Sequence, residues 1–356
     1  MSTPFAPVYT PAHFAAPLAW AEPARGAAFA AWLEQEARTH RLLPASVRVA
    51  SADASFRRYL RIDTETGATR IIMDAPPAHE NCAPFVRVAR LMLEAGLNVP
   101  RVLAWDEAHG FMLLTDLGAH TMMDALDPAN PGAALPLFDA AIDALVRWQL
   151  ASRPHELPPY DEALLRRELA LFPDWYLGQH RRLALDAAAR QTLDEAFGLI
   201  VRHNLASPSV YVHRDFMPRN LMPSEGSAAG LGILDFQDAM YGPITYDIAS
   251  LMRDAFISWD AEFVTEATRR YWHAARANGL PVEADFQRFR QAVDWMALQR
   301  HLKVAGIFAR LTLRDGKPKY LADAPRFIGY IRATASAHRE LTPLLRLIDQ
   351  AENVVR

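Results

Sequence analysis

The spacing of apolar and polar residues divides the chain at about residue 116. Residues 26–40 carry apolar side chains at helical intervals and predict a first helix. Short alternating runs at 47–51, 56–62, 70–73, 102–105 and 111–115 then predict five strands. Between the third and fourth runs, residues 81–95 have a broad apolar face that ends before Gly96, which is typical of a helix and its stop signal. The pattern predicts a five-stranded sheet with one inserted helix.

Beyond residue 116 the spacing is helical almost to the end. The segments that predict helices are 136–152, 161–181, 186–203, 246–256, 260–278, 285–309 and 325–340. The exception is a pair of short apolar runs, 210–212 and 231–234, on either side of a polar turn at 224–227. They predict a small β-hairpin region. A β-rich part at 26–116 is therefore expected to precede a helical part at 117–356, with a hinge near 114–118 on which the two lobes close.

The N-terminal residues 1–25 differ from both parts. They contain prolines at positions 4, 7, 11, 17 and 23, which remove hydrogen-bond donors and block helix formation. We expect an extended surface arm.

Composition excludes several classes of partner. The chain has 356 residues, 51% hydrophobic and 22% charged, with a net charge of -3. It lacks the basic excess of a nucleic-acid binder, and no run of 18 apolar residues predicts a membrane span. A single cysteine, Cys82, forms no internal disulfide and, with no secretory leader in the sequence, indicates a reducing cytoplasm. No protein partner is implied.

The chemistry-bearing segment is His213-Arg214-Asp215-Phe216-Met217-Pro218-Arg219-Asn220, which matches H-R-D-x-x-x-x-N. In kinase loops of this pattern the aspartate accepts the hydroxyl proton and the asparagine holds magnesium. Fifteen residues later an apolar strand ends at Asp235, a second metal-binding side chain. Each of these residue types alone is common in turns. The combination favours Asp215 as catalytic base and Asn220 and Asp235 as metal ligands.

Two further residues are assigned structural roles. His213 is expected to be a scaffold hydrogen-bonding residue in the loop. Asp247 precedes an apolar helix, and two interpretations stand beside each other: a helix N-terminal cap, or a buried carboxylate that accepts backbone N–H groups of the catalytic loop.

With these motifs the whole chain resembles the aminoglycoside phosphotransferase superfamily, which is built like a protein kinase. The stretch from Tyr211 to Leu251, together with 299–311 and 314–331, resembles its branch of anomeric N-acetylmuramate/N-acetylglucosamine kinases of peptidoglycan recycling. The resemblance implies an α+β bilobal fold, with a five-stranded antiparallel N-lobe carrying one helix and a mainly helical C-lobe. It also implies ATP and Mg²⁺, and assigns the segment from Leu114 to Leu117, with Thr115 and Asp116, to adenine.

Two departures concern the nucleotide phosphates. The loop at 51–59, which is expected to cover the phosphates, contains Ser55 but no glycine. The third strand, which also carries Ile71, has Met73 at the position where a lysine is expected. The chain has no lysine before Lys303. Arg57, Arg58 and Arg61 lie on the preceding strand; Arg58 is favoured as the phosphate cation, against the alternative that these arginines are solvated. A nucleotide-binding pseudokinase or an aminoglycoside kinase of the same fold is the alternative function.

Charge near the C-terminus bears on the acceptor. Residues 300–356 hold eleven Lys/Arg against five Asp/Glu, the reverse of a pocket for polycations. The charge disfavours a polycationic acceptor, and the resemblance implies a neutral or anionic amino sugar phosphorylated at its anomeric hydroxyl, with Asp215 against that hydroxyl. Arg300 and His301 would pair with the carboxylate of N-acetylmuramate, or form a solvated basic face. Trp175 and Tyr176 would stack on the sugar or pack in the core.

Overall fold

The computed structural model describes residues 18, 20, 22–52, 56–223 and 230–353. Most of the predicted arm and the predicted nucleotide residue Ser55 lie outside this set. The chain forms two compact units: the first takes residues up to Arg90 and Val99–Gly118, and the second takes Leu91–Asn98 and the chain from Ala119 onward. The first unit thus ends two residues after the expected boundary.

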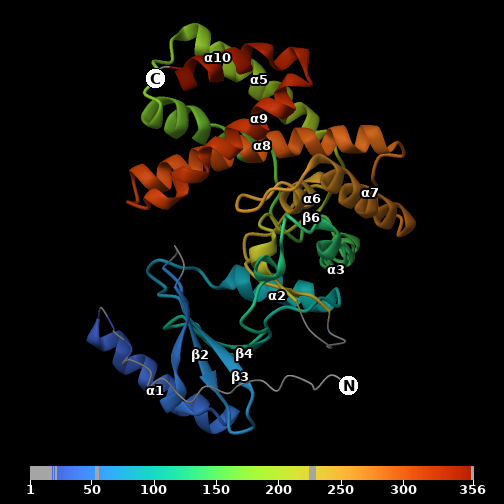
Figure 1. The fold of residues 1–356 in the computed structure, drawn as a ribbon. Coiled ribbons are helices and arrows are strands. Elements are labelled where there is room, and N and C mark those ends of the chain that lie inside the picture. The colour runs from blue at the N-terminus through green and yellow to red at the C-terminus, as the bar shows by residue number, and fades with distance from the viewer. Residues whose placement is uncertain (1–17, 19, 21, 53–55, 224–229, 354–356) are drawn as a thin grey trace. The chain divides into compact units, whose positions relative to one another are not determined.

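The first unit contains the five-stranded antiparallel sheet that the sequence predicts, in the order β1-β2-β3-β5-β4 (Figure 1). Its elements are α1 (Pro23–His40), η1 (Pro44–Ser46), β1 (Arg48–Ala52), β2 (Arg58–Asp63), β3 (Thr69–Asp74), α2 (Ala83–Glu94, which continues into the second unit), β4 (Val102–Asp106) and β5 (Phe111–Thr115). Helix α1 begins three residues earlier than predicted, because Pro23 stands at its first turn, where a missing N–H costs nothing.

Helix α1 covers one face of this sheet. Phe29 and Trp32 of α1 pack in one buried cluster with Leu60 and Ile62 of β2 and their neighbours on β3 and β5. Since side chains alternate along a strand, all β2 residues in phase with Leu60 belong to this covered face. This alternation decides where the candidate nucleotide residues point.

The second unit is mainly helical, as predicted. Its elements are η2 (Met122–Ala125), α3 (Pro131–Leu150), α4 (Glu162–Leu169), η3 (Phe172–His180), α5 (Ala187–Leu205), β6 (Ser209–Val212), η4 (Pro218–Asn220), β7 (Leu221–Met222), β8 (Gly232–Ile233), β9 (Met240–Pro243), α6 (Thr245–Met252), α7 (Ala261–Ala277), α8 (Phe286–Leu313), η5 (Pro318–Asp323), α9 (Ala324–Ser336), η6 (Arg339–Leu341) and α10 (Thr342–Asn353). The long helix α8 is central, with η3, α5, α6 and α9 packed against it (Figure 1).

The helices of this unit differ from the prediction in two places. The single helix expected over 161–181 is the helix α4 followed by a π-helix, η3. Gly306 of α8 faces this junction, where a β-carbon would lie 2.4 Å from the backbone of Leu171. The helix type changes at this close approach of two backbones. The spacing of apolar residues within 161–181 does not predict a contact with a distant helix. Helix α10 was not predicted.

The expected hairpin of 210–212 with 231–234 is also wrong. Strand β6 pairs with β9, and β7 pairs with β8. The apolar runs were recognised, but their partners were not, because short strands are paired by tertiary packing rather than by their own pattern. Among the described residues, no helix is both long and apolar enough to cross a membrane.

Candidate active site

The H-R-D-x-x-x-x-N segment forms a loop between strand β6 and helix η4 in the second unit. Asn220 Nδ2 donates to the carbonyl oxygen of Asp215 at 2.8 Å and lies 3.4 Å from Asp235 Oδ2. Asp215 is half-buried and Asp235 is exposed. The structure therefore brings together the three residues that the sequence assigns to proton acceptance and metal binding.

Two residues of this cluster have left-handed backbone conformations. Arg214 has φ 76° and Asp235 has φ 63°. Such angles are unfavourable for residues other than glycine, and structures retain them where surrounding contacts hold them in place. The loop around Asp215 is thus fixed by its environment.

His213 supplies part of that environment. The side chain is fully buried, its Nε2 donates to the Leu234 carbonyl at 3.0 Å, and its Nδ1 accepts from the Asp215 N–H at 3.3 Å. Burial lowers the pKa of the imidazole, which favours the neutral ring that this bonding requires. The contacts link the loop to the strand end that carries Asp235 and are those of a scaffold residue.

Asp247 on α6 is buried beneath the same loop. Its carboxylate accepts the N–H of His213 at 2.6 Å and the N–H of Arg214 at 2.9 Å. Of the two interpretations, the structure gives the contacts of the second, since Ile244 rather than Asp247 is the residue that precedes α6.

The donor atoms suit a hard divalent cation. Asn220 offers an amide oxygen once its Nδ2 is bonded to Asp215, and Asp235 offers a carboxylate. The described residues contain no cluster of three or more His, Cys, Asp or Glu that could hold a metal ion. Two oxygen side chains without a closed protein cage match a cation that also takes phosphate oxygens and waters.

The first unit holds the predicted nucleotide residues, and it separates them. Arg58 shares the α1-covered face with Leu60: it pairs with Asp74 at 2.7 Å and lies 4.0 Å from the ring centre of Trp20. Ile71 and Met73 belong to the opposite face by strand register. This placement argues against the prediction that Arg58 is the phosphate cation, because its guanidinium already pairs with Asp74 on the face that α1 covers. The alternation of side chains in the sequence does not say which face of the sheet α1 covers.

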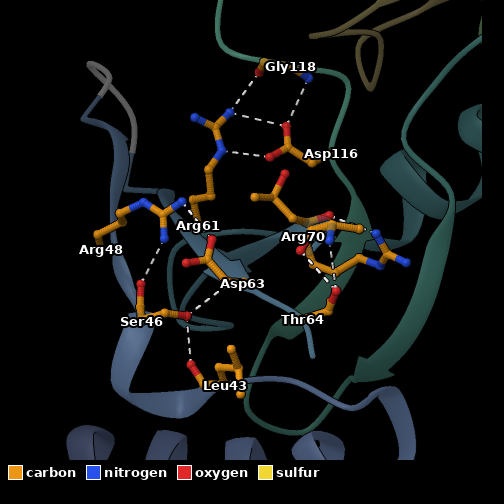
Figure 2. A network of polar contacts seen from close by, with 11 residues as sticks. Leu43, Ser46, Arg48, Arg61, Asp63, Thr64, Arg70, Asp116 and Gly118 are labelled. Carbon is orange, nitrogen blue, oxygen red and sulfur yellow. Dashed lines mark hydrogen bonds and ion pairs between the residues drawn. The ribbon is translucent and has the colours of Figure 1, made fainter. Parts of the chain in front are cut away.

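Arg61 lies on the same face as Ile71 and was not selected from the sequence. Its Nε donates to Asp116 Oδ2 at 2.6 Å and its Nη2 donates to the carbonyl of Gly118 at 2.7 Å. Figure 2 shows the Arg61 side chain between these two partners. The Arg61 guanidinium and the Gly118 N–H hold the pKa of Asp116 below its usual value despite the cost of burial. Thr115 accepts the N–H of Arg101 at its hydroxyl, 2.9 Å away. The segment assigned to adenine is therefore held in a defined turn, and Leu117 within it is half-buried.

The predicted acceptor residues are mostly interior. Tyr176 is fully buried and donates to Glu352 at 2.9 Å, whereas Trp175 is half-buried. Arg300 is buried and donates to the Arg214 carbonyl at 2.9 Å, and buried His301 stacks on Tyr330 with ring centres 4.9 Å apart. This burial disagrees with a solvated basic face at Arg300 and His301 and with a Tyr176 that stacks on the sugar. The helical spacing of these residues in the sequence does not show that they are buried.

Comparison with known proteins gives this arrangement a family. A family model described as "Phosphotransferase enzyme family", APH, matches residues 46–286. The chain belongs to this family. It is 49% identical, over 86% of its own length and 88% of the relative's, to the N-acetylmuramate/N-acetylglucosamine kinase of Pseudomonas aeruginosa. It is 46% identical to the kinase of the same name from Neisseria meningitidis, over 84% of its own length and 88% of the relative's.

Solved structures agree on the fold. An amicoumacin kinase in complex with AMP-PNP and Ca²⁺ superposes with a TM-score of 0.61 at 17% identity, covering 85% of this chain and 93% of that one. The GDP complex of an aminoglycoside 2'-phosphotransferase gives 0.57 at 12% identity, covering 86% and 98%. The kinase-like fold predicted from the sequence is confirmed, and the chain is a phosphotransferase enzyme.

Proposed function

We propose that this enzyme transfers the γ-phosphoryl group of ATP, with Mg²⁺, to the anomeric hydroxyl of N-acetylmuramate and N-acetylglucosamine, giving sugar 1-phosphates for cell-wall recycling. The proposal is supported by relatives of that name at 46–49% identity over most of the chain. A cytoplasmic location belongs to the same proposal, because the single cysteine suits a reducing compartment.

The observation that carries the proposal is the grouping of Asp215, Asn220 and Asp235. The backbone of Asp215 is hydrogen-bonded at both of its polar groups: its N–H donates to His213 Nδ1 and its carbonyl accepts from Asn220 Nδ2. A half-buried carboxylate fixed in this way is able to orient a sugar hydroxyl and accept its proton. Most of the rate then comes from alignment of the acceptor oxygen with the transferred phosphorus.

Asn220 and Asp235 would hold the metal ion. A divalent cation bound there neutralises negative charge on the transferred phosphoryl group. The bond from Asn220 Nδ2 to the Asp215 carbonyl has a second consequence, because it ties the metal ligand to the residue that accepts the proton. The cation site and the base are then positioned by one short segment.

Ile71, Met73 and the segment Thr115–Leu117 contribute to nucleotide binding in the same proposal. Arg61 joins them, because it fixes the turn at Asp116 and Gly118. The acceptor is a small amino sugar, and Trp175 is retained as a candidate contact, whereas buried Tyr176 is not.

Phosphorus NMR of the reaction with ATP, Mg²⁺ and each N-acetyl sugar tests the proposal. We expect a phosphorus signal coupled to the anomeric proton for both sugars. Asp215→Asn is the matched control and should give no sugar phosphate while still binding ATP. Turnover of a polyamine antibiotic with neither N-acetyl sugar converted would contradict the proposal.

A further inference from the structure

Arg214, the residue before the proposed base, is held at three points by charged side chains of three different helices. Its N–H donates to Asp247 of α6 at 2.9 Å, and its carbonyl accepts from Arg300 of α8 at 2.9 Å. Its guanidinium pairs with Glu168 of α4 at 2.5 Å. A residue in the unfavourable left-handed region, next to a reacting carboxylate, is thereby fixed in its backbone and its side chain.

Glu168 is the most heavily bonded of these partners. It is buried, and one carboxylate oxygen accepts from both Arg214 and Lys303, whose Nζ lies 2.8 Å away. The other oxygen accepts from the Tyr160 hydroxyl and from Gln299 Nε2 at 3.0 Å. Every lone-pair direction of the carboxylate has a donor, which is the condition under which a buried charge is tolerated.

Lys303 contacts both Glu168 and helix α6 beneath the catalytic loop. It also lies 3.2 Å from the Tyr246 hydroxyl, next in sequence to Asp247. Lysine occurs in this chain only at 303, 317 and 319, so a mostly buried lysine beside the catalytic loop stands out from the arginine-rich background. The cations Lys303 and Arg214 hold the pKa of Glu168 down to about 2 against the opposing effect of burial, so the carboxylate is charged at neutral pH.

We propose that Glu168, held by Lys303, is a positioning residue that fixes Arg214 and, through the Arg214–Asp215 peptide, the carboxylate that accepts the sugar proton. The inference rests on the proposed role of Asp215. Glu168 and Lys303 touch neither substrate nor metal ligand in this scheme. Their contribution is to prevent the loop from relaxing out of the left-handed conformation at Arg214.

The first test compares Glu168→Gln with Glu162→Gln. Both residues are on α4, and Glu162 forms an exposed pair with Arg166 at 2.7 Å. We expect Glu168→Gln to lower kcat by about 100-fold, the cost of a misplacement of about 1 Å, with the KM for ATP and for sugar changed less than about threefold. Glu162→Gln should match the parent enzyme. A normal kcat in folded Glu168→Gln overturns the inference.

Hydrogen exchange supplies a readout that is independent of turnover. The amides of Arg214 and Asp215 should exchange faster in Glu168→Gln, while those of α5 stay protected. Unchanged exchange in the loop overturns the inference even if activity falls. Failure of the parent enzyme to phosphorylate either sugar would instead remove the proposed function, and the exchange comparison still decides whether Glu168 orders the loop.

Two further variants keep the test decisive if Glu168→Gln does not fold. Glu168→Gln with Lys303→Gln removes one charge of each sign and leaves Arg214 without its anchor. Arg214→Gly removes the side chain but suits the backbone, since glycine adopts φ 76° freely. Both should fold and show the same loss of kcat at nearly constant KM. Parent-like kcat in Arg214→Gly would mean that the backbone angle alone, without the Glu168 anchor, positions the base, and would overturn the proposal.

Discussion

The catalytic loop of the second unit and the sheet of the first unit show opposite relations between sequence and site. In the loop, contiguous residues His213 to Asn220 carry the chemistry, and short-range bonds bring them to Asp235. In the sheet, the candidate cations are isolated strand residues whose use depends on which face a helix covers. Arg58 turns out to face α1, and Arg61 faces the other way. A local motif constrains its own geometry, whereas a strand residue is assigned by what packs against it.

The largest effect expected from this difference is at the loop. Asp215→Asn keeps the size and shape of the side chain but replaces the basic carboxylate by a neutral amide that cannot accept a proton. We expect kcat to fall by about 10³-fold or more with ATP affinity nearly unchanged, measured by steady-state kinetics and calorimetry. A tenfold or smaller loss would place the proton acceptor elsewhere.

In the sheet, the sensitive position is Gly110 rather than an arginine. It has φ 70°, and a β-carbon there would lie 1.9 Å from the carbonyl oxygen of Ala75. Gly110→Ala should lower the free energy of unfolding of the first unit by about 3 kcal/mol, through backbone strain and overpacking. Urea unfolding measures it, and exchange at β3 and β5 should rise before exchange at α5. Gly67→Ala, also at positive φ but with open space around it, is the control for backbone strain alone.

The two arginines of β2 test the assignment of faces directly. Arg58→Met breaks the pair with Asp74, which keeps Arg25 as a partner, so we expect about 2 kcal/mol lower stability and unchanged ATP affinity. Arg61→Met takes from buried Asp116 the cation that it pairs with, so it should weaken ATP binding several-fold and lower stability as well. Equilibrium binding of a fluorescent ATP analogue and thermal unfolding separate the two effects. The opposite pattern would return Arg58 to the phosphate site.

The smallest expected effect is a pH dependence from His301. Burial, with Arg253 and Arg300 nearby, lowers the pKa of this imidazole well below its usual value of 6.5. The unfolded chain therefore takes up a proton that the folded chain does not, and stability is lost as the pH falls below about 6.5. Between about pH 7.5 and about pH 5.5, the free energy of unfolding of His301→Phe should fall by about 1 kcal/mol less than that of the parent. Urea unfolding at the two pH values measures this difference. Identical pH slopes would contradict this.

Much of the fold followed from the sequence because the periods of its apolar residues are local properties. The five strands, α1 and most helices of the second unit are each specified by their own spacing, with errors of a few residues at their ends. The same holds for Asp215, Asn220 and Asp235, whose order and separation match one chemistry. The pairing of β6 with β9 and the π-helix η3 did not follow, because they depend on contacts with distant segments such as Gly306 of α8.

By itself, then, the sequence determined the kinase-like architecture and the identity of the residues proposed for proton acceptance and metal binding, because both reside in short-range patterns. Only the tertiary structure decided that Arg58 is paired beneath α1, that Arg300 supports the Arg214 carbonyl, and that Glu168 and Lys303 lie under the loop. The physical reason is burial: the sequence does not show whether a charged side chain is solvated or paired with a buried partner. Its role depends on which of these the fold provides.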